Sequence, residues 1–196
     1  MKVFLAGEGP DELGDRHEPP QYRANPPDVG IVEALLHKVG AADVDVVGAR
    51  IWKSIKKFRF KPAVRGEVQN VLGLVVEADE VGADALVFVR DQDGYLDRQE
   101  DVEEGIRQVV ARGYGSAIVG GVAVQEIEAW ILALLGERRS EGHADAKAVL
   151  GERHGIVDRA AKVAVIEGAE LARVPDDAVS LRTWLGRASA VLVVKQ

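Results

Sequence analysis

The chain has no cysteine among its 196 residues. That absence excludes disulfide bonds, thiolate zinc sites and a cysteine nucleophile. No stretch approaches the ~18 consecutive apolar residues of a membrane helix. The first residues enter a strand-like pattern directly, without the basic and apolar segments of a signal peptide. We therefore expect a cytoplasmic protein that does not contact a membrane.

Positive charge is also scarce, because 25 Lys and Arg residues stand against 32 Asp and Glu residues and give a net charge of -7. Coating nucleic acid over the whole surface is excluded, since such binding depends on neutralising phosphates with Lys and Arg. The composition, 47% hydrophobic and 29% charged, is that of a globular protein. The length suits a single domain with a small appendage.

One local stretch runs against the overall charge. Its basic residues alternate with the aromatic residues Trp52, Phe58 and Phe60. Aromatic rings among cations suit a groove for phosphates and stacked bases. A solvated loop whose aromatic residues anchor it to the core has the same composition, so both interpretations stay open. The candidate nucleic-acid-binding residues are Lys53, Lys56, Lys57, Arg59, Lys61 and Arg65.

Two apolar runs, 3–6 and 85–90, each stop at acidic residues. The first run leads to Glu8, with Asp11 and Glu12 close behind, and the second leads to Asp91 and Asp93. Buried parallel strands read as continuous apolar runs, and ligands bind beyond their carboxyl ends in open α/β sheets. Several carboxylates on one rim repel each other unless a cation lies between them. Oxygen ligands of this kind suit magnesium or manganese.

The order of periodic segments predicts an α/β fold with a mostly parallel central sheet and helices on both faces. We expect residues 1–136 to form this core and residues 137–196 to form a helical extension packed on it as one compact unit. The expected elements are a strand at 3–6, a proline-rich loop at 10–27, a helix at 28–39, a strand at 44–47, a helix at 67–81, a strand at 85–90, a helix at 100–112, a strand at 116–124 and a helix at 125–135.

Each acidic motif has a structural alternative. Flanking glycines let Glu8 turn into the crevice at a strand end, but a strand-ending turn with an exposed acid is the commoner interpretation of that motif taken alone. Asp91 and Asp93 are two residues apart, so both project to one side of an extended segment. The same residues also suit a solvated turn.

Glu126 and Glu128 open the helix that follows the fourth strand. Acidic residues in a first helical turn are favoured by the helix dipole, which is sufficient reason for their presence. Residues two apart on a helix point roughly 200° apart, so the pair cannot face one metal together. We prefer Glu126, which is nearer the strand end, and place Glu128 second.

Other chemistry has weaker support. The chain contains no Walker A loop and no complete dinucleotide-binding fingerprint, and its four histidines lack metal-ligand spacing. Trp130 is expected to pack in the core. Surface solvation is the first interpretation of four further cations that could contact phosphates, which are Arg159, Lys162, Arg182 and Arg187.

Together these motifs resemble the Toprim fold of topoisomerases, primases and OLD-type nucleases, and they are most similar to small stand-alone bacterial Toprim-like proteins of unknown function. The matching parts are Glu8 within Ala6-Gly7-Glu8-Gly9, the Asp91-x-Asp93 pair, and the Glu-Ala-Trp of residues 128–130 in the helix start at 125–130. The resemblance covers residues 1–135. Beyond them it extends only loosely, through Lys162 before a final helix with Trp184.

The resemblance implies that Glu8 is a general acid or base and that Asp91 and Asp93 are magnesium ligands. Two departures limit what it implies. The loop at 10–27 is long and proline-rich where a helix normally begins sooner, and no motif places a tyrosine as a topoisomerase nucleophile. Topoisomerase activity is therefore not expected, and primase activity ordinarily requires further domains.

The sequence thus predicts metal-dependent hydrolysis of phosphodiester bonds, with Glu8 as the catalytic group and Mg²⁺ or Mn²⁺ as the cofactor. Its expected metal ligands are Asp91, Asp93, Glu126 and Glu12. Nucleic acid, either DNA or RNA, is the expected partner, and a homodimer or a protein partner in a defence system is left open.

Two alternatives belong to other classes. The first is a non-catalytic nucleic-acid-binding or regulatory module, for instance in phage defence. The second is a small-molecule phosphohydrolase, because aspartates at strand ends also serve phosphate-monoester chemistry. Phospho-aspartate versions of that chemistry need a nucleophilic Asp after the first strand, where this chain has Glu8.

Overall fold

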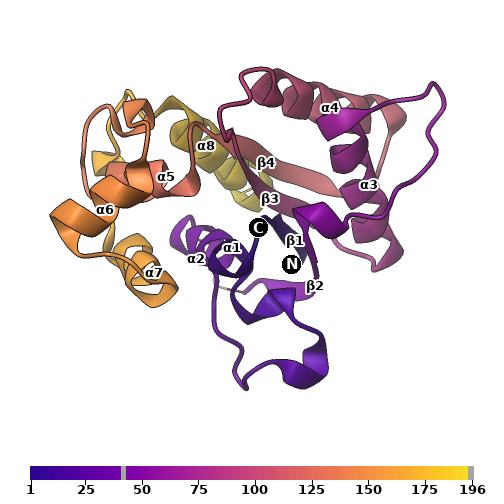
Figure 1. Cartoon of the computed structure of the whole chain (residues 1–196). Coiled ribbons are helices and arrows are strands. Elements are labelled where there is room, and N and C mark those ends of the chain that lie inside the picture. Colours follow the sequence, from indigo (N-terminus) through magenta and orange to yellow (C-terminus); the bar gives the residue numbers. More distant parts are fainter. Residues whose placement is uncertain (41–42, 194–196) are drawn as a thin grey trace.

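The computed structural model describes residues 1–40 and 43–193, which form a parallel sheet with helices on both faces (Figure 1). The four strands lie in the order β2-β1-β3-β4, and every neighbouring pair is parallel. Their bounds are β1 Lys2–Gly7, β2 Asp45–Ile51, β3 Ala85–Asp91 and β4 Ala117–Ala123. Parallel pairing needs a crossover between successive strands, which the helices supply. The predicted α/β fold is confirmed.

Eight α-helices lie in the described ranges, and none of them is long and apolar enough to cross a bilayer. They are α1 Pro10–Leu13, α2 Ile31–Lys38, α3 Gly66–Glu80, α4 Arg98–Arg112, α5 Ile127–Leu134, α6 Ala146–His154, α7 Arg159–Gly168 and α8 Val179–Val193. Short 3-10 turns fill several connections, at η1 Gly14–His17, η2 Pro20–Tyr22, η3 Trp52–Ser54, η4 Ser140–Gly142 and η5 Leu171–Arg173.

The central strands supply two hydrophobic cores, because successive side chains of a strand point to opposite faces. Leu5 and Val87 lie in the core shared with α2, α5, α7 and α8. Phe4 and Phe88 lie in the other core, beneath α3 and α4. Full burial of each such side chain contributes ~1.5–3 kcal/mol. Figure 1 shows α3 and α4 on one side of the sheet and α2, α5 and α8 on the other.

The chain leaves the two central strands in opposite directions. From β1 it crosses to β2 at one edge, and from β3 it crosses to β4 at the other. This reversal makes a topological switch point, and the crevice at the carboxyl ends of β1 and β3 is the expected ligand site of such a sheet. The end of β1 at Gly7 and the end of β3 at Asp91 therefore mark the expected ligand site.

The segment expected as a loop at 10–27 contains α1, η1 and η2 instead. The following helix begins at Ile31 and not at Asp28, because Gly30 packs directly against the backbone of Gly14. A Cβ on either glycine would collide with the other segment. The Asp15 N–H donates to the Asp28 carbonyl over 3.0 Å and closes the same contact.

The C-terminal helices pack on the sheet. The Trp184 Nε1 donates to the Phe88 carbonyl over 3.0 Å, and Arg187 donates to the Gly120 carbonyl over 2.6 Å. Trp130, expected in the core, is fully buried, and its Nε1 donates to the Ser180 hydroxyl over 2.7 Å. Side chains of α8 thus form hydrogen bonds with β3, with β4 and with Trp130 of α5, the helix that follows β4.

Candidate functional site

Glu8 and Asp91 meet at the switch point between β1 and β3. The Glu8 Oε1 accepts a hydrogen bond of 3.0 Å from the Asp91 backbone N–H. Glu8 also forms an ion pair with Arg90, which precedes Asp91 in β3. Glu8 and Asp91 are therefore in contact, as their places at neighbouring strand ends predict. The contact joins the Glu8 carboxylate to the Asp91 backbone, so the two carboxylates do not share a partner.

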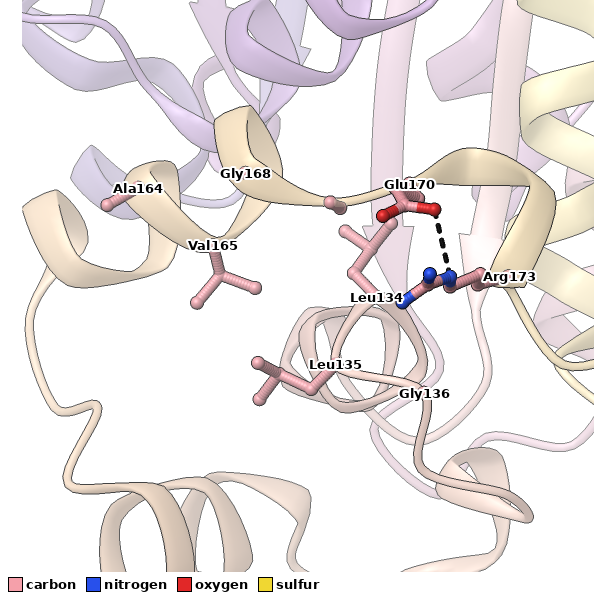
Figure 2. Close-up of a pocket in the computed structure, with 9 residues that line it drawn as sticks. Leu134, Leu135, Gly136, Ala164, Val165, Gly168, Glu170 and Arg173 are labelled. Carbon is pink, nitrogen blue, oxygen red and sulfur yellow. Dashed lines mark ion pairs between the residues drawn. The ribbon is translucent and has the colours of Figure 1, made fainter.

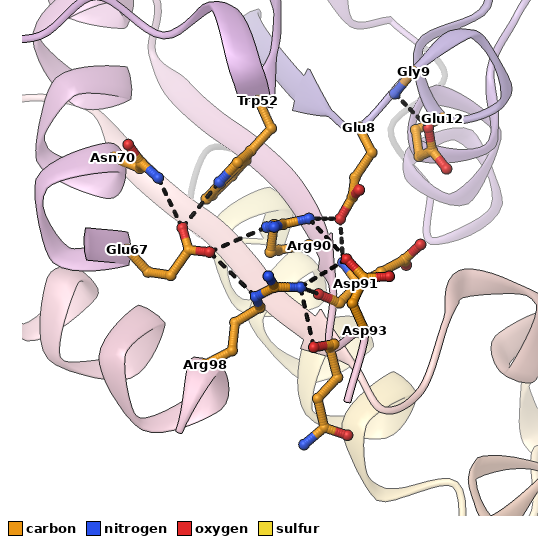
Figure 3. A network of polar contacts seen from close by, with 11 residues as sticks. Glu8, Gly9, Glu12, Trp52, Glu67, Asn70, Arg90, Asp91, Asp93 and Arg98 are labelled. Atoms are coloured by element: carbon orange, nitrogen blue, oxygen red, sulfur yellow. Dashed lines mark hydrogen bonds and ion pairs between the residues drawn. The ribbon is translucent and has the colours of Figure 1, made fainter. Parts of the chain in front are cut away.

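On one side of this contact lies an arginine network, which consists of Glu8, Glu67, Arg90, Asp93 and Arg98 (Figure 3). The Glu67 Oε1 accepts a hydrogen bond from Arg90 Nε over 3.3 Å and lies 3.2 Å from Arg98 Nε in an ion pair. The Asp93 Oδ2 lies 2.9 Å from Arg98 Nη1 and 3.5 Å from Arg90 Nη1. Two guanidinium groups thus face three carboxylates. Burial and the nearby charge of Arg98 lower the pKa of Arg90.

Trp52 extends this network toward the basic stretch. Its Nε1 donates to Glu67 over 2.9 Å, and the Arg90 guanidinium lies 5.5 Å from the centre of its ring. Cations over aromatic faces are stabilised by the ring quadrupole. The buried indole therefore fixes both Glu67 and Arg90.

A second group of carboxylates lies on the other side of Asp91. It consists of Asp91, Glu12 and Glu128, and we call it the carboxylate cluster. Glu12 and Glu128 are both buried. The Lys162 Nζ lies 2.7 Å from Glu128 Oε1 and 2.5 Å from Asp11 Oδ2, and the lysine itself is 1% exposed. Lys162 is thus the cation that balances this side.

Two members of the carboxylate cluster, Asp91 and Glu12, have raised pKa values. Burial raises the pKa of Asp91 to about 8, with added repulsion from Glu12, Glu128 and Asp93. Burial likewise raises the pKa of Glu12. Burial alone would lower the pKa of Lys162, but its bonds to Asp11 and Glu128 outweigh that effect and raise it. Metal-free Asp91 is therefore largely protonated at neutral pH.

Glu12 reaches the cluster because Gly7 has no side chain. A Cβ at Gly7 would meet the Glu12 Cβ at 2.6 Å. The Gly9 backbone N–H donates to Glu12 Oε2 over 2.8 Å and orients the carboxylate. The short helix α1, which begins with Pro10, turns the chain back over the end of β1. A glycine, a backbone bond and one helical turn thus place Glu12.

The structure brings Glu128, and not Glu126, to Asp91. Glu126 caps α5, and its Oε1 accepts a 2.6 Å hydrogen bond from the Lys147 backbone N–H in α6. Burial raises the pKa of Glu126. The helix begins only at Ile127, and Glu126 precedes it with an extended backbone, so the argument from helical spacing does not apply to this pair. The inner position belongs to Glu128.

The loops after β3 and β4 are tied together by strained residues. Asp93 and Gln125 both have positive φ angles, of 49° and 66°. The Asp93 N–H donates to the Gln125 carbonyl over 3.1 Å, and the Gln92 side chain accepts from the Gln125 N–H over 3.3 Å. Such strain is frequent at functional sites. The left-handed turn at Asp93 also breaks the extended geometry that would align its side chain with Asp91.

The six basic candidates form an exposed strip from Lys53 to Arg65, which we call the basic strip. Within it, the Lys56 Nζ lies 3.0 Å from Glu80, and the Lys57 Nζ donates to Asn70 over 2.6 Å. Its other cations, Lys53, Arg59, Lys61 and Arg65, make no side-chain hydrogen bond or ion pair with any described residue. The basic strip follows Trp52 in the sequence, its Lys56 pairs with Glu80 at the end of α3, and its last cation, Arg65, directly precedes the start of that helix.

Of the four further cations, only Lys162 belongs to the site. Arg159 pairs with Asp28 at 3.0 Å, Arg182 pairs with an exposed aspartate, and Arg187 pairs with a glutamate of α4. Figure 2 shows a separate pocket of about 340 Å³, formed by apolar residues of α5 and α7 and the exposed Glu170–Arg173 pair. No member of the arginine network or carboxylate cluster lines that pocket.

Within residues 1–40 and 43–193, no three Asp, Glu or His side chains are arranged as a preformed metal site. The donor chemistry of the carboxylate cluster nevertheless suits a hard divalent cation, because its ligand atoms are all oxygens. No protein-family model, curated protein or solved structure matches the chain. Function must therefore be inferred from these residues.

Proposed function

We propose that this chain is a metal-dependent phosphodiesterase that acts on nucleic acid, with a Toprim-like core. The observation that carries the proposal is the meeting of Glu8 and Asp91 at the β1–β3 switch point, where the charges of Glu12 and Glu128 help to raise the pKa of Asp91. Buried carboxylates that repel one another raise the free energy of the folded protein. A divalent cation between them removes that repulsion.

The ligands we propose for Mg²⁺ or Mn²⁺ are Asp91, Glu12 and Glu128. When bound, the ion supplies charge neutralisation at the phosphate and an activated water. Glu126 as the ligand of a second ion requires its bond to Lys147 to open. Asp93, paired with Arg98 at 2.9 Å, would serve by positioning that arginine.

The arginine network supplies the rest of the proposed site. Arg90 and Arg98 present planar guanidinium groups that match the geometry of a phosphate. A phosphate that binds Arg90 competes with Glu8 for the same guanidinium. The released Glu8 carboxylate then lies next to the reacting group, where it accepts a proton from the attacking water or returns it to the leaving oxygen.

The basic strip would guide the substrate backbone toward this site. Its cations are exposed, and its first residue, Lys53, follows Trp52, which contacts both Glu67 and Arg90. Phosphate contacts of this kind position a nucleic acid without reading its sequence. The strip would give a protein of net charge -7 a local affinity for polyanions.

The decisive experiment is a cleavage screen with single- and double-stranded DNA and RNA in Mg²⁺, Mn²⁺ or chelator. We expect metal-stimulated cleavage that Asp91→Asn abolishes, while the matched exposed variant Asp177→Asn keeps it. Circular dichroism checks that both variants fold. Cleavage that survives in Asp91→Asn, or a wild type that cleaves none of the four substrates with either metal, contradicts the proposal.

A second candidate is a nucleic-acid-binding module without catalysis. It is favoured by the arginine network, in which Arg90 and Arg98 already neutralise Glu8 and Asp93. Chelator-resistant binding without cleavage, lost on substituting Lys56, Lys57 and Arg59, would support this candidate. Binding that disappears with chelator would exclude it.

A further inference from the structure

A pocket of about 650 Å³ opens beside the arginine network, between the start of α3 and the loop that leads from β3 into α4. Glu67 and Arg98 line the pocket and also belong to the network. A molecule in the pocket is therefore a direct neighbour of Arg90, Asp93 and the proposed phosphate position. The pocket and the arginine network thus share the side chains of Glu67 and Arg98.

The pocket exposes two large side chains that proteins usually cover. Tyr95 is 66% exposed and Leu96 is 81% exposed. The Arg98 guanidinium lies 4.7 Å from the centre of the Tyr95 ring, and the Tyr95 N–H donates to the Gln92 carbonyl over 2.9 Å. One face of the ring is thus supported while much of the ring remains accessible. A fixed, exposed aromatic ring is a platform on which a base stacks.

The polar groups of the pocket fit the edge of a base better than a phosphate. The carboxylates of Asp97 and Asp101 line the pocket and are exposed. Neither side chain forms an ion pair or hydrogen bond with any residue in the described parts of the chain. Free carboxylates repel phosphate, but they accept hydrogen bonds from amino groups such as that of cytosine.

The basic strip reaches the rim of the same pocket. Asn70 lines the pocket, and its Oδ1 accepts from the Lys57 Nζ over 2.6 Å. Arg65, the last cation of the strip, precedes the pocket residue Gly66. A strand whose phosphates follow the strip can therefore turn a base into the pocket, which an intact duplex cannot do without breaking a base pair.

We propose that this pocket binds one unpaired nucleobase, stacked on Tyr95 with its amino edge toward Asp97 and Asp101. The inference rests on the proposed function for the identity of the ligand as nucleic acid, and it narrows that ligand to a single strand or an unpaired region. The base pocket holds the strand so that a neighbouring phosphate lies at the arginine network.

The test is equilibrium binding in chelator, measured by fluorescence anisotropy, so that cleavage does not enter. The probes are labelled single strands of about eight nucleotides: oligo-dC, oligo-dT, a fully abasic strand, and the oligo-dC strand in a duplex. We expect oligo-dC to bind more tightly than its duplex and the abasic strand. Tyr95→Ala should weaken oligo-dC binding by about fivefold to a hundredfold, and should leave abasic-strand binding unchanged.

Two further comparisons separate a base pocket from general effects. Tyr95→Phe should keep the affinity, and Tyr22→Ala should match the wild type, because Tyr22 is even more exposed, at 73%, but lies outside the pocket. Asp97→Asn combined with Asp101→Asn should reduce the preference for oligo-dC over oligo-dT, which differ in the amino group.

The inference is overturned if Tyr95→Ala binds oligo-dC like the wild type, if it weakens the abasic strand equally, or if the duplex binds as tightly as the single strand. Failure here leaves the proposed function intact when Asp91→Asn still abolishes cleavage. If the protein cleaves none of the substrates but still binds oligo-dC through Tyr95, the base-pocket proposal is supported and the phosphodiesterase proposal fails.

Discussion

Lys162 and Glu128 form an ion pair of 2.7 Å in the interior of the protein, where the lysine side chain is 1% exposed and the glutamate side chain is 8% exposed. The pair joins α7 to α5 and carries the positive charge of the carboxylate cluster. Without Lys162, Glu128 would be a buried charge with no cation paired to it, whereas Lys162 without Glu128 would keep its contact with Asp11. The pair therefore couples the stability of the C-terminal helices to the proposed reaction site.

Replacing only the lysine should destabilise the protein. Lys162→Met leaves Glu128 and Asp11 without their cation, and breaking a buried pair in this way costs ~3–5 kcal/mol in the free energy of unfolding. Urea denaturation measures the loss. The double variant Lys162→Met with Glu128→Gln should recover part of it, and the exposed Lys53→Met should have little effect. A change below about 1 kcal/mol in Lys162→Met would contradict this interpretation of the pair.

Metal-free stability should fall as the pH rises from 6 to 9. The folded protein keeps a proton on Asp91 up to a pKa of about 8, whereas the unfolded chain loses it near pH 4. Raising the pH through this window removes a proton from the folded state only, which lowers the free energy of unfolding by on the order of 1 to 3 kcal/mol.

Urea titrations in chelator at several pH values measure this dependence. Asp91→Asn cannot lose that proton, so its stability should depend less on pH over the same window. Asp177→Asn is the control and should keep the wild-type slope. Equal slopes in wild type and Asp91→Asn would assign the dependence to other groups.

Divalent cations should stabilise the protein through Glu128 more than through Glu126. A ligand that binds only the folded state adds about 2.7 kcal/mol at a concentration one hundred times its Kd. We expect Mn²⁺ to raise the thermal midpoint of the wild type, and Glu128→Gln to remove most of that increase. Glu126→Gln is the matched control in the same helix start and should keep it. The reverse order would favour the ligand predicted from the sequence.

A methyl group at Gly7 should disturb the site. Gly7→Ala places a Cβ 2.6 Å from the Glu12 Cβ, so Glu12 and α1 must move. Overpacking of this kind costs ~1–3 kcal/mol, and any metal-dependent activity should fall with it. Gly115→Ala is the control, because a Cβ there meets nothing within 4 Å. Unfolding curves and the cleavage assay compare the two, and identical behaviour would show that Glu12 needs no such space.

The sheet could be predicted from the sequence because buried parallel strands leave a strong signal. The apolar runs at 3–6 and 85–90 lie within β1 and β3, and their acidic ends bring Glu8 and Asp91 into contact. Predicting the sheet and this contact requires only the alternation of strands and helices and the rule that ligands bind at the carboxyl ends of parallel strands.

The partners of these acids could not be predicted in the same way. Arg90, Arg98 and Glu67 come from two strand-to-helix segments that are distant in sequence, and no local pattern pairs them. The positive φ of Asp93 removes the alternation from which its direction was argued. One signal was present for Glu128, since an acid inside a helix that is otherwise entirely apolar must be buried with a partner.

The contact between Gly14 and Gly30 has a consequence for how this protein can vary. The chain leaves the neighbourhood of the site at Gly14, makes an excursion through residues 18–27, and returns at Asp28 and Gly30 to nearly the same place. The two ends of the excursion are held together by the contact between Gly14 and Gly30. A change in the length of the excursion should therefore leave the position of Glu12 unchanged. Insertions, tags or whole added modules should be tolerated there, which makes this excursion the place to attach a reporter without touching the chemistry.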